Sequence, residues 1–387
     1  MDKLVYLAYP AVLLLLLAGA RMYGPGQWNE ESMSLRQCKL WQGFFAVCIM
    51  LHHAGQKTCA FWLNRRYIIP GLEFFVPIGY YFVAFFLVCS GYGLYKSVHA
   101  KPDYLKGFVR RRVLPVVAAF YAVEWIYIAV RLAMGEAMSA QQILLYILSV
   151  PQANPNSWYV IATPVLYLAF YVCYRFIRRD GAALAGVFAL TLLWVLAGCA
   201  TDHNDVFMTG EWWYNSVLFF PLGMLLAKHG HALRAAAKRA WLPLLLLCAA
   251  AGYGLYMASE LAQNVYGYYC EWSPSLADRV LRRFVCVLSQ TGAAGAFVCF
   301  VLLLGMKLRI GNPVLSFMSG MTLEFYLIHA IFVELFGFDF LEVRPSLWYI
   351  RNVALYLAVV AACSVPAAML LRAVLHPGKY LLRTAKE

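Results

Sequence analysis

The chain has 387 residues, of which 63% are hydrophobic and only 13% are charged, and its mean hydropathy is +0.66. Apolar runs recur along its whole length, which excludes a soluble globular domain. The formal net charge of +13 therefore indicates cytoplasmic loops rather than nucleic-acid binding, because membrane proteins keep excess Lys and Arg on the cytoplasmic side. Since no loop is long enough for a soluble domain, the sequence predicts an all-α integral membrane protein, a polytopic bundle of about 11 transmembrane helices.

The first apolar run, Leu4–Ala20, ends in Ala18-Gly19-Ala20 and has two interpretations. It is either a signal peptide with a small-residue cleavage site or a retained first helix. The charge pattern of the later loops favours retention. Residues 1–35 are therefore set apart as an extra N-terminal helix with a cytoplasmic linker.

The second apolar segment, Lys39–Gln56, carries a polar stripe. On a helix with about 100° per residue, one face collects every third or fourth position. The residues on this face are Lys39, Gln42, Ala46, Ile49, His53 and Gln56. Gln42 and His53 lie roughly 16 Å apart along it, and His52 points about 80° away. Because lipid cannot satisfy polar groups, the stripe must face other helices or a water-filled cavity.

Nine further apolar segments predict the remaining spans. They cover 74–95, 113–133, 158–177, 182–200, 212–227, 242–258, 280–306, 314–336 and 349–371. Gln141–Val150 is too short to span and is predicted to be interfacial or re-entrant. Glu124 and Glu324 lie inside spans, where each is either a carboxylate that orients His53 or a hydrogen-bond partner for helix packing.

The connections between spans alternate in charge. The most basic one holds Lys96, Lys101, Lys106, Arg110, Arg111 and Arg112. Placing the basic connections in the cytoplasm puts the acidic loops outside and the C-terminus inside, in the inner (plasma) membrane of the cell. The Lys39–Gln56 helix then runs from Lys39 at the cytoplasmic side to His53 near the outer side.

The cysteines predict no metal site, since the 11 of them lack CxxC or Cys/His ligand spacing. Cys59 and Cys270 alone fall in predicted extracytoplasmic loops, where they are either free or paired in a disulfide. Tyr268, Tyr269 and Trp272 in the same outer loop are typical either of sugar stacking or of interfacial anchoring.

Several short motifs share the order and spacing of one known family. They are the His52-His53 helix end, Phe85-Phe86 with Ser90-Gly91-Tyr92, Arg110-Arg111-Arg112 before Pro115, Ser157-Trp158-Tyr159, and Glu324-Phe-Tyr326-Leu-Ile-His329. In these the chain resembles the acyltransferase-3 family of integral-membrane O-acyltransferases. The resemblance runs over residues 36–372, the expected membrane domain, and leaves 373–387 as a basic cytoplasmic tail.

The resemblance implies transfer of an acyl group, often acetyl, from acyl-CoA to a hydroxyl of a cell-envelope or extracellular glycan. Acyl-CoA is then a co-substrate and no bound cofactor is expected. The family places a basic residue, ten intervening positions and then its critical histidine. His53 takes the histidine position, whereas Gln42 stands where Arg or Lys is expected, and Lys39 one turn earlier offers a charge. The family's cytoplasmic basic pair falls within Arg110–Arg112.

The chemistry of acyl transfer assigns roles to these residues. A neutral histidine, with an ordinary pKa of about 6.5, can deprotonate the attacking hydroxyl, so His53 is the expected base with Glu324 beside it as the second catalytic residue. The guanidinium groups of Arg110, Arg111 and Arg112 have the geometry to bind the phosphates of acyl-CoA. The alternative is that these arginines are only an orientation signal. The remaining predicted substrate-binding residues are Lys39, Gln42, Gln56, Ser90, Trp158 and Tyr326. His329, one turn from Tyr326, is either structural or catalytic.

Two other classes of protein fit a polar stripe in a membrane helix. A glycan or lipid transporter or flippase would line a permeation path with it, although no inverted repeat or paired broken helices are visible. A sensor or assembly subunit would bind a lipid-linked glycan without chemistry. Release of CoA from labelled acyl-CoA separates an acyltransferase from both.

Overall fold

The computed structural model describes residues 3–201, 203, 210–266, 275–338, 346 and 348–377. The α-helices are α1 (Ala8–Leu17), α2 (Leu35–Thr58), α3 (Gly79–Ala100), α4 (Leu114–Ala133), α5 (Ala140–Ile147), α6 (Trp158–Phe176), α7 (Asp180–Ala200), α8 (Phe219–Arg239), α9 (Trp241–Tyr266), α10 (Leu276–Gly305), α11 (Pro313–Met318), α12 (Thr322–Phe336) and α13 (Val353–Leu375). Short 3₁₀ segments are η1 (Lys3–Leu7), η2 (Glu73–Ile78), η4 (Pro155–Ser157) and η5 (Glu211–Trp213), and η3 (Val109–Val113) is a π-helical turn. Strands β1 (Arg21–Met22) and β2 (Leu308–Arg309) pair antiparallel.

The predicted all-α polytopic membrane fold is confirmed. Among the described residues, 7 helices are long and apolar enough to cross a membrane. They span 73–100, 109–133, 155–176, 180–200, 241–266, 276–305 and 353–375. The other predicted spans also form helices, but these are short, as in α12 and the Lys3–Leu17 helix, or carry several charges, as in α2 and α8.

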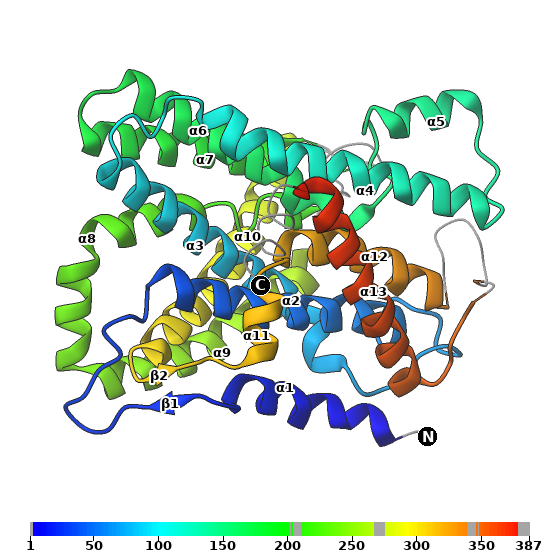
Figure 1. Ribbon diagram of the computed structural model, residues 1–387, viewed down its shortest axis with the longest axis horizontal. Helices are drawn as coiled ribbons and strands as arrows, with labels where there is room; N and C mark the ends of the chain where they lie inside the picture. Colours follow the sequence, from blue (N-terminus) through cyan, green and yellow to red (C-terminus); the bar gives the residue numbers. More distant parts are fainter. Residues whose placement is uncertain are drawn as a thin grey trace.

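Helix α2 lies inside the bundle and packs against α3, α11, α12 and η2 (Figure 1). Its start is fixed by Ser34, whose side chain accepts a hydrogen bond from the Gln37 amide in the first turn. Near this end, Gly43 lets the backbone of α11 approach closely, because an added Cβ would lie 3.0 Å from the Leu315 carbonyl oxygen. Almost every side chain of α2 from Leu40 to Ala54 is buried or half-buried, so its polar residues face protein.

Some predicted boundaries are corrected by the structure. The span predicted over 212–227 begins later, at Phe219, and α8 continues to Arg239. The span predicted over 314–336 is interrupted, because α11 ends at Met318 and α12 starts at Thr322. The short segment predicted over 141–150 forms α5, which has a capping box at Ser139 and no buried residue, as an interfacial helix would.

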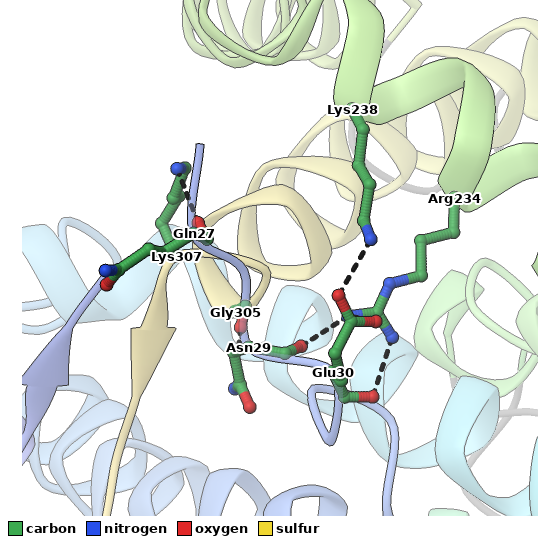
Figure 2. A network of polar contacts seen from close by, with 7 residues as sticks. All are labelled: Gln27, Asn29, Glu30, Arg234, Lys238, Gly305 and Lys307. Atoms are coloured by element: carbon green, nitrogen blue, oxygen red, sulfur yellow. Dashed lines mark hydrogen bonds and ion pairs between the residues drawn. The ribbon is translucent and has the colours of Figure 1, made fainter. Parts of the chain in front are cut away.

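The predicted N-terminal linker docks against the ends of α8 and α10 (Figure 2). Asn29 donates its side-chain amide to the Gly305 carbonyl at 2.9 Å. Glu30 accepts from Lys238 at 2.8 Å and pairs with Arg234 at 3.0 Å, and the hydrogen bond from Lys238 lowers the pKa of the Glu30 carboxyl. Lys307 donates to the Gln27 carbonyl at 2.7 Å. The linker is therefore held by hydrogen bonds to backbone carbonyls as well as by ion pairs.

This docking depends more on Asn29 than on Glu30. Asn29 is 1% exposed, so Asn29→Ala leaves the Gly305 carbonyl buried without its donor and should cost about 1–3 kcal/mol. The Glu30 side chain is 67% exposed, so Glu30→Ala should change stability little. Thermal unfolding of the purified protein in one detergent measures both, and equal midpoints for the two variants would contradict the assignment.

Candidate functional site

Two buried histidines meet where α2 packs against α12. Nδ1 of His53 lies 2.8 Å from Nε2 of His329, and the two rings are nearly parallel at 7° with centroids 5.0 Å apart. His53 is 7% exposed and His329 is 0% exposed. The pair joins the helix that carries the polar stripe to the helix that carries the last family-like motif, 276 residues apart in the chain.

The hydrogen bonds fix which nitrogen of each ring carries the proton. Nδ1 of His329 lies 2.8 Å from the Phe325 carbonyl oxygen, which can only accept, so this nitrogen is the donor. A neutral His329 then has a bare Nε2, which accepts from Nδ1–H of His53. The lone pair of His53 therefore sits on Nε2, the nitrogen on the far side of its ring. A chain of two neutral histidines thus ends in a base.

His52 has a different environment. Its Nδ1 lies 3.0 Å from the Phe75 carbonyl oxygen, and its ring fills the space beside Gly79, where an added Cβ would collide with it. The ring therefore holds α2 against η2 and the start of α3. The two neighbours thus contact different helices, as their predicted helical faces imply.

An ion pair lies one turn further along the same two helices. Nζ of Lys57 is 2.7 Å from Oε2 of Glu334, and the side chains are 21% and 3% exposed. Glu334 was not singled out from the sequence, although a carboxylate five residues after His329 in an apolar helix is the signal that could have found it. The α2–α12 contact therefore holds four ionisable side chains in succession.

Aromatic side chains form one wall beside the histidine pair. The ring of Tyr326 lies 6.5 Å from His53 and 5.4 Å from Tyr159, and its hydroxyl donates to the Asn156 carbonyl at 2.9 Å. Trp158, 7% exposed, starts α6 and contacts Tyr159 edge to face. Of the predicted binding residues, Tyr326 thus lies next to His53, and Trp158 joins the wall through Tyr159.

Glu124 organises the turn that holds this wall. It is 0% exposed and accepts hydrogen bonds from the Ala153 amide at 2.7 Å and the Ser157 hydroxyl at 2.9 Å. The adjacent Asn154 donates its side-chain amide to the Leu327 carbonyl of α12 at 3.2 Å. Of the two roles considered for Glu124, the contacts show the structural one.

Of the two roles considered for Glu324, the described contacts do not show the orientation of His53. Glu324 lies in the first turn of α12, five residues before His329, which is about 7.5 Å along the helix axis. It is 5% exposed, and its carboxylate lies 3.6 Å from Nε2 of His376. The neighbour of His53 is therefore His329, because α12 presents position 329 rather than 324 at its crossing with α2.

Among the described residues, none of the other predicted binding residues hydrogen-bonds His53, although Gln56 lies one turn from it on the same helix. Lys39 is exposed and Gln42 and Gln56 are half-buried, and none of the three side chains makes a hydrogen bond or ion pair within the described parts of the chain. Ser90 contacts the Tyr167 hydroxyl at 2.8 Å and so links α3 to α6. Beside it, Gly91 allows close contact with the Phe220 carbonyl of α8, where a Cβ would collide.

The basic cluster Arg110, Arg111 and Arg112 lies on the exposed surface of the η3 turn rather than in a loop. Arg111 donates to the Tyr104 carbonyl at 2.8 Å, and the Arg112 guanidinium lies 6.0 Å from the Tyr104 ring. Arg112 precedes Glu124 by 12 residues of the same span, about 18 Å along its axis. The basic cluster and Glu124 are thus separated by a large part of a membrane thickness.

One predicted outer loop lies outside the residues that the structure describes. This loop contains Tyr268, Tyr269, Cys270 and Trp272, so neither the sugar-stacking nor the disulfide alternative is tested. Cys59 contacts the Gly55 carbonyl through Sγ at 3.4 Å. Within the described ranges, no group of three His, Cys, Asp or Glu side chains could hold a metal ion.

The family model described as an acyltransferase domain, of the acyltransferase-3 type, matches residues 38–372. The chain belongs to this family. It is therefore a membrane acyltransferase, and the histidine pair, the aromatic wall and the basic η3 turn of this acyltransferase-3 protein all fall inside the matched region. Searches of curated proteins and of solved structures found no match to the chain.

Proposed function

We propose that this acyltransferase moves an acyl group, acetyl by family resemblance, from acyl-CoA to a hydroxyl of a cell-envelope or extracellular glycan. The observation that carries the proposal is the chain from the Phe325 carbonyl through His329 to His53, since it leaves the Nε2 lone pair of His53 ready to accept a proton. A channel or flippase needs no such base.

In the reaction, the glycan hydroxyl attacks the thioester carbonyl while Nε2 of His53 takes its proton. The tetrahedral intermediate then collapses, the C–S bond breaks, and the CoA thiolate leaves and recovers the proton from the imidazolium. His329 is a positioning residue, because its bare Nε2 holds Nδ1–H of His53 and keeps the ring turned. One nitrogen of the His53 ring accepts the proton while a partner residue holds the other nitrogen, as in known pairs of a base and its orienting residue.

The two substrates reach His53 from opposite ends of α2. The phosphates of acyl-CoA bind at the exposed Arg110–Arg112 surface, where guanidinium forks match them, and the thin pantetheine arm extends inward. The glycan approaches from the end where Lys57, Tyr67, Tyr349 and Arg351 line one small pocket. The pocket has a volume of only about 10 Å³, so a sugar would lie over its Tyr67 and Tyr349 rings rather than enter it.

The test of this function is chemical. Envelope glycans from cells with and without the gene are compared by mass spectrometry, and cells carrying His53→Ala serve as the matched control. An acyl mass increment should disappear in both the deletion and the variant. Unchanged glycan acylation together with altered glycan export would favour the transporter alternative instead.

The basic cluster gives a second test. Replacing Arg110, Arg111 and Arg112 by Gln should weaken binding of acyl-CoA and flatten its dependence on salt, because screened charge contacts are lost. Titration of a fluorescent acyl-CoA at several ionic strengths measures this. The charge-matched control replaces Arg65, Arg66 and Arg351 at the other end of the bundle. Equal affinity in the two triple variants would reduce the cluster to an orientation signal.

The proposed orientation places the C-terminus and the η3 turn in the cytoplasm and the Lys57 end outside the plasma membrane. Single cysteines replacing Ser97 and Arg65 should then react with a membrane-impermeant maleimide from opposite sides, Ser97→Cys only in inverted vesicles and Arg65→Cys only in intact cells. Labelling of both from one side would refute the orientation.

A further inference from the structure

A groove of about 320 Å³ lies between α6 and α7, which run side by side at one edge of the molecule (Figure 1). Its walls include Val165, Leu168, Ala169 and Val172 of α6 and Leu190 and Trp194 of α7. These are helices apolar enough to cross a membrane, so the groove opens toward lipid. Its volume is at the lower end of the range that small-molecule sites occupy.

The groove offers a ligand hydrocarbon surface. Its two polar side chains are turned to protein, since Thr191 donates to the Val187 carbonyl at 2.7 Å and the indole of Trp194 donates to the Trp213 carbonyl at 3.1 Å. No soluble anion or sugar would be held by such walls. An acyl chain would be, because it needs only close contact with apolar atoms.

The two helices pack closely near the α6–α7 connection. There Gly186 allows close packing, as an added Cβ would lie 3.0 Å from the sulfur of Cys173. Along the groove, the lining residues Val165, Leu168, Leu190 and Val172 are 38%, 41%, 43% and 47% exposed, so the two helices present an open trough. A lipid acyl chain in this trough would run parallel to the two helices. Its end nearest the α6–α7 connection would lie at the membrane surface.

Three arginines stand at that surface end. Arg175 follows Val172 by three residues and continues the groove-lining face of α6, and Arg178 and Arg179 form the connection to α7. All three are exposed, and among the described residues none has an ion-pair partner. The nearest carboxylate in the chain, Asp180, is already held by Lys228 at 2.8 Å and His99 at 3.1 Å.

We propose that the groove and these arginines form a binding site for one anionic phospholipid. An acyl chain fills the groove, and the phosphate lies against Arg175, Arg178 and Arg179 at the level of the head groups. Basic sites between membrane helices select anionic lipids in this way. A zwitterionic lipid would fill the groove equally well but would carry no net charge for the three guanidinium groups. The site is separate from the histidine pair, so it stands or falls independently of the acyl-transfer chemistry.

Native mass spectrometry of the full chain tests the site. The protein is released from nanodiscs that contain equal amounts of phosphatidylglycerol and phosphatidylcholine of the same chain length. Each arginine near the head groups should raise the affinity for phosphatidylglycerol about fivefold relative to phosphatidylcholine, so three of them should raise it about a hundredfold. The variant with Arg175, Arg178 and Arg179 replaced by Gln should retain the two lipids alike. A control variant with Arg36, Lys101 and Lys106 replaced by Gln, which removes the same charge from other exposed positions, should keep the preference.

A second variant tests the groove itself. Ala169→Phe fills the space with a ring while keeping the arginines, so it should lower occupancy by both lipids. Its unfolding midpoint shows that the bundle is intact. Equal occupancy of the two lipids in the unmodified protein, or an unchanged preference after loss of the three arginines, overturns the proposal. Full lipid occupancy in a folded Ala169→Phe protein overturns the placement of the chain.

Discussion

Replacement of His53 by Ala should reduce acyl transfer about 10²–10⁴-fold, the usual loss when a general base is removed. The reason is that Nε2 of His53 is the free end of the hydrogen-bond chain from the Phe325 carbonyl through His329. Release of CoA from labelled acyl-CoA by the purified protein measures the rate. In the unmodified protein that rate should fall at acid pH, because a protonated imidazole cannot take a second proton.

His52→Ala is the matched control for this prediction. It removes the hydrogen bond to the Phe75 carbonyl and the ring beside Gly79, so it should lower the unfolding midpoint while the folded fraction keeps most of its activity. His329→Ala should fall between the two in activity, since the base remains but its ring is no longer held. An inactive His52→Ala with an active His53→Ala would mean that the other face of α2 carries the chemistry.

Sequence periodicity could predict that His53 faces protein, because the helical face of a residue depends only on its own helix. A polar residue in an apolar helix must face protein, and spacing along one helix states which residues share a face. The same reasoning could not supply the partner of His53. Glu324 and His329 lie on one predicted span, and the choice between them depends on where α12 crosses α2. That crossing is set by tertiary packing and by the break before Thr322, which no single-helix pattern contains.

The apolar segments were predictable for a similar reason, since the bilayer imposes length and hydropathy on each span separately. The docking of the N-terminal linker was not predictable. Its principal contacts are between side chains and the backbone carbonyls of Gly305, Gln27 and Asn29, and any sequence offers such carbonyls. The ion pair between Lys57 and Glu334 could not be predicted from the sequence, because Lys57 lies at the end of a span, where a cation usually indicates a loop.

Breaking the ion pair between Lys57 and Glu334 should have a large effect on stability. The Glu334 side chain is 3% exposed, so Lys57→Met removes the ammonium from a carboxylate that water scarcely reaches. Removing one partner of a buried ion pair typically costs about 3–5 kcal/mol, more than the pair itself contributes. The double variant Lys57→Met/Glu334→Gln removes both charges and should recover most of that loss.

Chemical unfolding of the two single variants and the double variant in one detergent gives the coupling between the residues. The assay of CoA release should follow the same order, because the pair lies one turn beyond His53 and fixes how α2 meets α12. Strictly additive losses in the double variant would mean that the contact adds nothing to the packing of these helices. A stable double variant that transfers no acyl group would instead make at least one of the two charges part of the chemistry, since the packing of the helices would be intact while both charges had gone.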